Sequence, residues 1–250
     1  MLIRLVLAAL LVLAGLAPAG AQTPLKASDL AREFEEISFP QRAFPPGVRG
    51  PRREFRRAPQ PLPKPLKISV FATAGDPAAD VLEDILRGLA ATLRKETKVR
   101  IQARPGRHHP FSVVGMRENG FKARAMFFGA ADPSFLTAFS FAQGMKKEGC
   151  FFYSSLGDHG EIVGGSVLVD LDRPEVWRSC IHRGVIHILG LEGNTLAPTG
   201  VFTDVPKVRG LTARDLAIVR MAYDPRLKPG MTLAEARPLL PAIAADALAR

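Results

Sequence analysis

The stretch CIHRGVIHILGL, residues 180–191, ends the most clearly patterned helix that the chain predicts. The residues DRPEVW, 172–177, offer an Asp-x-x-Glu capping box and a proline in the first turn, so we expect the helix to begin there. Gly190 lies where such a helix stops. Apolar or small residues recur every three or four positions: Trp177, Cys180, Ile181, Gly184, Val185 and Ile188. This stripe predicts a helix face that packs against a sheet.

Two histidines lie on the same predicted helix. His182 and His187 are five residues apart, and about 100° per residue places them about 140° apart around the axis. We therefore do not expect them to share a metal ion. A zincin protease needs two histidines four residues apart, with a glutamate after the first as general base. If His187 is the second histidine, Arg183 takes the first ligand position and Gly184 takes the position of the base.

The residues around this helix resemble a known family of bacterial secreted and envelope proteins, the domain-of-unknown-function family 2927. The matching positions are Cys180, Leu189, Gly190, Leu191 and Asn194, then VFTD at 201–204 and the run LAIVRMAYDPRLKPGMTLAEA at 216–236. The resemblance covers about residues 66–238 and implies a zincin-like fold with a protease-type helix. This chain departs from the family pattern at Arg183, Gly184 and His187, so the resemblance implies a degenerate motif.

Alternating and helical patterns predict the class of the fold. Strands are expected at residues 66–74, 98–105, 123–130, 150–155 and 161–171, and further helices at 76–97, 132–143 and 212–223. Val81, Ile85, Leu86, Leu89 and Leu93 are expected on the buried face of the helix at 76–97. Strands that alternate with helices predict an α+β domain with a mixed sheet and packed helices.

The N-terminal quarter divides into two expected segments. Residues 1–21 combine Arg4, an apolar run and Ala19-Gly20-Ala21, which is typical of a secretory signal peptide. We expect a mature chain that starts near Gln22, is secreted or periplasmic, and has no transmembrane segment after signal removal. Residues 22–65 predict an extended, basic, proline-rich segment with a short helix capped by Ser28, and residues 66–250 a single domain.

The positive charge is concentrated in one part of that segment. The chain has a net charge of +10, and residues 41–67 carry eight basic residues against one acidic residue, Glu54. The folded part is therefore close to neutral, which does not favour a nucleic-acid-binding domain. The basic segment is interpreted either as a solvated linker or as an arm that binds an anionic surface.

The two cysteines, Cys150 and Cys180, lie in no C-x-x-C pair. In an exported protein they predict one disulfide, although metal-binding or reactive thiols are alternatives. The predicted bridge would join the start of a strand to the middle of the patterned helix.

Four further side chains or groups of side chains are candidates for a role. His187 could bind zinc together with His159 and a carboxylate, Asp158 or Glu161, if the loop at 156–160 folds over the helix. Alternatively, Arg183 could form an ion pair with Asp204 or Asp215 in place of a metal. Met221 could lie beneath a metal or, as core methionines commonly do, in the core. The adjacent His108 and His109 are interpreted as part of an exposed turn.

Three hypotheses about function follow. The favoured one is an exported, zincin-like domain without catalytic zinc, which binds a protein or envelope component through a cleft beside the helix at 180–191. The second is a zinc-dependent metallohydrolase with an atypical ligand set around His187. The third is a protein whose basic arm binds a polyanion or the envelope surface. The first hypothesis predicts no cofactor, and the second predicts bound zinc.

Overall fold

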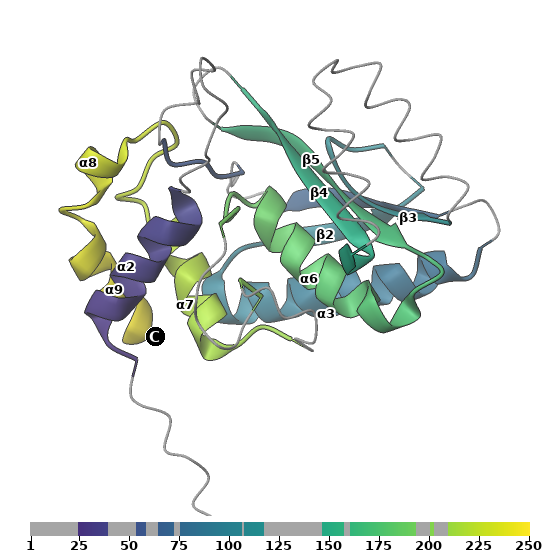
Figure 1. Ribbon diagram of the computed structural model, residues 1–250, viewed down its shortest axis with the longest axis horizontal. Coiled ribbons are helices and arrows are strands. Elements are labelled where there is room, and N and C mark those ends of the chain that lie inside the picture. The colour runs from purple at the N-terminus through teal and green to yellow at the C-terminus, as the bar shows by residue number, and fades with distance from the viewer. Residues whose placement is uncertain are drawn as a thin grey trace, which may run out of the picture.

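A five-stranded sheet and two long helices form the larger part of the structure (Figure 1). The protein is described by a computed structural model for residues 25–39, 54–58, 65–72, 76–106, 108–117, 147–157, 161–193, 201–202 and 210–250. The predicted α+β class, a mixed sheet with packed helices, is confirmed.

The sheet has the strand order β2-β1-β3-β5-β4. Its strands are β1 (Leu66–Phe71), β2 (Ile101–Pro105), β3 (Phe111–Met116), β4 (Cys150–Leu156) and β5 (Ile162–Asp170). Neighbouring strands are parallel except for β4, which runs antiparallel to β5 along one edge. β3, which the sequence analysis did not predict, lies at the centre of the sheet. The strand expected at 123–130 and the helix at 132–143 lie outside the described residues.

One face of the sheet is covered by α3 (Ala78–Thr97) and α6 (Trp177–Ile188). The buried stripe of α3 consists of Leu82, Leu86, Leu89 and Leu93. This spacing of four, three and four residues keeps the four leucines on one face. Val81, expected in that stripe, is exposed instead, because it lies about 100° away from Leu82 around the helix axis.

The patterned helix begins differently from the prediction. A 3₁₀ turn, η1 (Pro174–Val176), precedes α6, and no side chain caps either element. The expected capping box is not formed, because Arg117 at the end of β3 donates to the Asp172 carboxylate at 2.7 Å. The same guanidinium donates to Asp76, and thereby ties the carboxyl ends of the parallel strands together.

A second group of helices lies beside the sheet (Figure 1). It consists of α2 (Ala27–Ser38), α7 (Ala213–Ala222), α8 (Leu233–Ala236) and α9 (Leu240–Leu248). α2 packs against α9 and α7 through Leu30, Phe34 and Ile37, which are fully buried. The predicted cap residue Ser28 lies within the first turn of α2, whose N-cap is Lys26 without a side-chain hydrogen bond.

The packed body therefore begins before Leu66, the expected start of the domain. In addition to α2, residues 54–58 lie inside the fold, where Phe55 and Ala58 are fully buried. The short helix expected in this segment is present as α2, and both α2 and residues 54–58 bury apolar side chains against the rest of the structure, which an extended, solvated segment would not do. None of the helices in the described part of the chain has the length and apolar character needed to cross a membrane.

Candidate functional site

The predicted disulfide is present. Cys150 and Cys180 are bonded, with their Cα atoms 5.8 Å apart, and both side chains are buried. The bridge joins the first residue of β4 to the middle of α6, and the Glu148 carbonyl lies 3.8 Å from each sulfur. Edge strand and helix are thus covalently tied at one end of the space between them.

Gly184, at the position of a zincin's general base, lies against the sheet. A Cβ atom there would lie 2.5 Å from a Val167 side-chain carbon and 2.7 Å from the Phe152 ring. The absence of a side chain lets α6 approach β4 and β5 closely. A glutamate at this position would have to displace that packing, so the position serves helix–sheet contact and offers no place for a base.

Arg183, at the first ligand position, is a cation with no acceptor atom and therefore cannot bind zinc. Its Nη1 donates to Glu148 Oε2 at 3.0 Å, and its guanidinium lies 5.9 Å from the centroid of the Phe152 ring. The predicted structural ion pair thus exists with a different carboxylate. Asp215 instead caps α7 through Thr212 and accepts from the Val201 amide, and Asp204 lies outside the described residues.

The two histidines of α6 have different surroundings. The His187 ring lies on the Phe152 ring, with centroids 5.4 Å apart, and is partly exposed. His182 is buried, and its Nδ1 has no hydrogen-bond partner. Burial lowers the pKa of His182 from 6.5 to about 4, with the nearby positive charge of Arg178 as a smaller cause. His182 is therefore neutral near pH 7.

The residues present do not fit the zinc site of a zincin. Among the described residues no group of three histidine, cysteine, aspartate or glutamate side chains could hold a metal ion. His159 and Asp158, needed for the atypical set around His187, lie outside those residues, as does Asn194. His108 stacks near Phe71 with centroids 4.9 Å apart, and Met221 is fully buried in the core.

A cleft of about 240 Å³ lies beside α6. One side is built from β4 and Glu148, which lies two residues before it, and the other from the segment that follows α6. Its lining is aromatic or apolar at Phe151, Phe152, Leu191, Val201 and Phe202 and polar at Glu148, Arg183, His187 and Glu192, and Cys150 and Gly193 complete it. Apolar walls with a few convergent polar groups are typical of ligand-binding clefts.

The cleft brings together residues that sequence reasoning found and residues that it missed. Arg183, His187 and Leu191 were expected beside it. Glu148, Phe152 and Glu192 were not, because their role depends on β4 lying antiparallel at the sheet edge next to α6. Both glutamates are paired with arginines, Glu148 with Arg183 and Glu192 with Arg56. The two glutamates on its walls are therefore each balanced by an arginine.

The end of α6 explains the glycine in its Leu-Gly-Leu motif. Gly190 has a φ of +110°, and the Leu191 amide donates back to the Ile186 carbonyl at 3.3 Å, which closes the helix in a Schellman-type turn. A Cβ at Gly190 would lie 2.1 Å from the Arg56 carbonyl oxygen. Gly190 thus both ends the helix and lets residues 54–58 pass directly over it.

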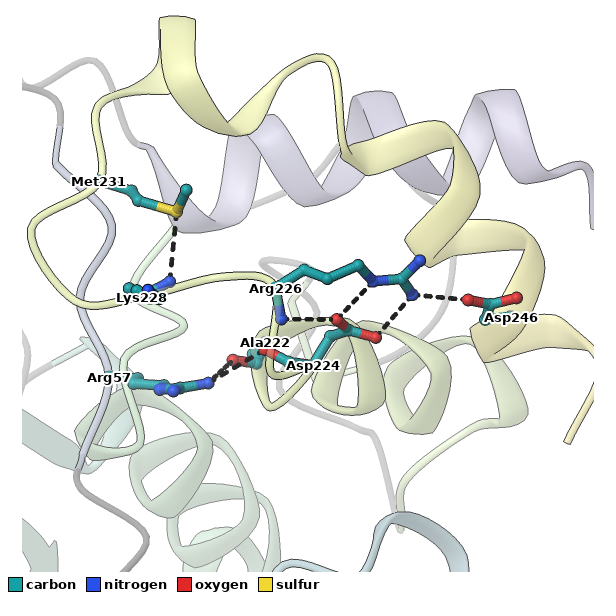
Figure 2. Close-up of polar contacts among 7 residues, drawn as sticks. All are labelled: Arg57, Ala222, Asp224, Arg226, Lys228, Met231 and Asp246. Carbon is teal, nitrogen blue, oxygen red and sulfur yellow. Dashed lines mark hydrogen bonds and ion pairs between the residues drawn. The ribbon is translucent and has the colours of Figure 1, made fainter.

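The YDPRLKPGM run forms the loop Tyr223–Met231, shown in Figure 2. Arg226 donates to both carboxylate oxygens of Asp224, at 2.7 and 2.8 Å, and also to Asp246 of α9. The Arg226 guanidinium holds the pKa of Asp224 below its usual value. The Lys228 amide lies 3.2 Å from the sulfur of Met231 and closes the loop. The stretch that matches the family most specifically therefore stabilises the fold.

These features define an α+β domain with a mixed sheet, whose cleft lies between an antiparallel edge strand and a disulfide-tied helix. The chain belongs to the family described as "Protein of unknown function (DUF2927)", and the match covers residues 28–242. The matched region runs from α2 into α9 and so includes the N-terminal helix and residues 54–58. No curated protein and no solved structure matches the chain.

Proposed function

We propose that this protein is an exported, zincin-like domain without catalytic zinc, which works in the periplasm or outside the cell as a binding or scaffolding module. The observation that carries the proposal is the cleft beside α6, with its aromatic walls and its paired charges. The arginine and the glycine at the zincin ligand and base positions argue against hydrolysis. The leader-like residues 1–21 and the disulfide support export.

The walls of the cleft indicate the chemistry of its ligand. Its carboxylates are paired with arginines, so a strongly charged ligand would have to compete with existing ion pairs. Three phenylalanine rings favour an apolar or aromatic group, and the partly exposed His187 adds a further ring to the lining. The cleft thus suits an aromatic or aliphatic side chain on a partner protein or envelope component.

Binding can be tested on the mature, oxidised protein with a library of N-acetylated dipeptide amides as probes. Nuclear magnetic resonance of ¹⁵N-labelled histidine side chains should show shifts at His187, and none at His182, for peptides with aromatic or branched side chains. Phe202→Asp should abolish the response, because it places a charge in the apolar wall, whereas Val81→Asp, at an exposed site on α3, should not. Equal shifts at both histidines, or no shift with any peptide, would refute the proposal.

The zinc hypothesis has its own measurement. After dialysis against micromolar zinc, elemental analysis should find the same zinc content in the wild type and in His187→Ala. Stoichiometric zinc that disappears in this variant would instead support the metallohydrolase with an atypical ligand set. Export is checked separately by the mass of the protein recovered from the periplasm, which should correspond to a chain beginning near Gln22.

A further inference from the structure

Residues 54–58, the strap, connect parts of the fold that lie far apart in the sequence. The Phe55 amide donates to the Met231 carbonyl at 2.7 Å, and the Gly230 amide donates to the Phe55 carbonyl at 2.9 Å. On the other side, the Ile162 amide donates to the Arg57 carbonyl at 3.0 Å. The strap is therefore hydrogen-bonded both to the loop Tyr223–Met231 and to the start of β5.

Two side chains fix the strap in place. Phe55 is fully buried between Phe34 and Phe39, with ring centroids about 6 Å apart in each pair. Arg57 donates to the carbonyls of Ala222 and Asp224 (Figure 2). Its guanidinium carbon also lies 5.8 Å from the centroid of the Tyr223 ring. Burial lowers the pKa of the Arg57 guanidinium, which stays charged, so its loss would leave two carbonyls without this donor.

The strap also contacts the wall of the cleft. The Ala58 amide donates to the Leu189 carbonyl at 3.2 Å, and the Arg56 backbone passes over Gly190. Arg56 Nη1 lies 3.8 Å from Glu192 Oε2, and the Glu192 side chain is only 6% exposed. The amide of the wall residue Gly193 donates to the Ile37 carbonyl at 2.8 Å, so α2 also holds this wall. One wall of the cleft thus rests on the N-terminal segment.

We propose that the strap couples the N-terminal arm to the cleft, so that release of residues 54–58 loosens the wall Leu191–Gly193 and changes what the cleft binds. This inference rests on the proposed function of the cleft as a binding site. A ligand that contacts the wall stabilises the seated strap, and by linkage anything that unseats the strap weakens binding by the same factor. The strap lies within the basic segment 41–67, and its release would thus regulate the cleft. This role is separate from any binding of that segment to anionic surfaces.

The coupling can be measured without a ligand, by amide hydrogen exchange on the full mature chain. Arg56→Gln removes the pair with Glu192 and leaves the anchors Phe55 and Arg57 in place. Loss of about 1 kcal/mol from a mostly buried pair should raise exchange of the Gly193 and Ala58 amides about fivefold. Glu192→Gln should have the same effect, and the double variant should add little to either single change.

The matched control is Arg237→Gln, which removes an ion pair with Glu35 in which no residue of the strap or of the cleft takes part. It should leave exchange at Gly193 and Ala58 unchanged, and all three single variants should leave the amides of β3 protected. Unchanged exchange at Gly193 in both Arg56→Gln and Glu192→Gln would overturn the coupling. A uniform rise across the whole chain would overturn it too, because that result indicates global destabilisation.

The peptide titration then separates this inference from the proposed function. If the strap acts as proposed, peptide bound at His187 slows exchange of the Ala58 amide in the strap, because the ligand stabilises the seated strap. Arg56→Gln weakens peptide binding only to the extent that it lowers the fraction of molecules with a seated strap. Peptide binding that leaves Ala58 exchange unchanged would refute the coupling while the proposed function stands. Wall exchange that rises without any peptide binding in the wild type would refute the proposed function alone.

Discussion

The two parts of the family resemblance, the end of α6 and the loop Tyr223–Met231, use their polar residues in different ways. In the loop, arginine and aspartate side chains are held in a closed network that joins α9 and the strap. Beside α6, Arg183, Glu148 and His187 line an open cleft and are partly exposed. The closed network stabilises the fold, whereas the cleft retains polar groups that a ligand can reach. A specific sequence motif is therefore no guide by itself to where a protein acts.

The largest effect on the free energy of unfolding is expected from a substitution in the strap, which the closed network holds in place. Phe55→Ala removes a fully buried ring that contacts two other phenylalanines and should cost about 4 kcal/mol in the free energy of unfolding. Urea unfolding followed by circular dichroism measures this loss. A cost below about 1 kcal/mol would mean that the strap is not part of the cooperative core.

Gly190→Ala should cost somewhat less, about 3 kcal/mol, because a Cβ meets the Arg56 backbone and the φ of +110° is strained for alanine. Gly88→Ala is the matched control. Gly88 lies within α3 with nothing within 4 Å of the added Cβ, so this change should stabilise the protein by up to about 1 kcal/mol. Opposite signs for the two substitutions, measured by thermal unfolding, would confirm that Gly190 is required by the strap. Equal effects would contradict this.

The buried His182 of α6 extends the comparison to the pH dependence of the free energy of unfolding. The folded-state pKa of His182 is about 4, below its unfolded value of 6.5, so protonation favours the unfolded state. Stability from this residue is complete above about pH 6.5 and is lost as the pH falls toward 4, by up to about 3 kcal/mol. Unfolding free energies measured from pH 7 to 4 should show a slope that His182→Gln reduces. A slope that His182→Gln leaves unchanged would contradict the assignment.

The smallest effects are expected from two arginines, one in each region. Arg57→Met should cost about 2 kcal/mol, since it leaves two carbonyls of the α7 end without their charged donor. Arg183→Met should cost less than about 1 kcal/mol, because its pair with Glu148 is partly exposed. The difference, read from chemical unfolding midpoints, tests whether the cleft contributes little to stability. A larger loss from Arg183→Met would assign that ion pair a structural role.

The sequence predicted those elements whose pattern is local. The stripe of α6, the capped helix at Thr212 and the disulfide all follow from spacing or composition, and all are present. β3 was missed because FSVVGM is short and is interrupted by serine and glycine, so that its burial comes from the neighbours on both sides. Glu148 and Glu192 were missed because their positions in the cleft depend on the sheet order, which no local pattern contains.

The packing of α2 against α9 has a consequence for the time course of biosynthesis. Leu30 and Phe34 of α2 are among the first residues of the described chain to be made, whereas α9, against which α2 packs, is among the last. The N-terminal helix therefore remains without its packing surface until synthesis is nearly complete. A chain of this design stays incompletely folded while it is being made, a state that is compatible with the export proposed above. The fold is closed by its two ends only when synthesis has reached α9.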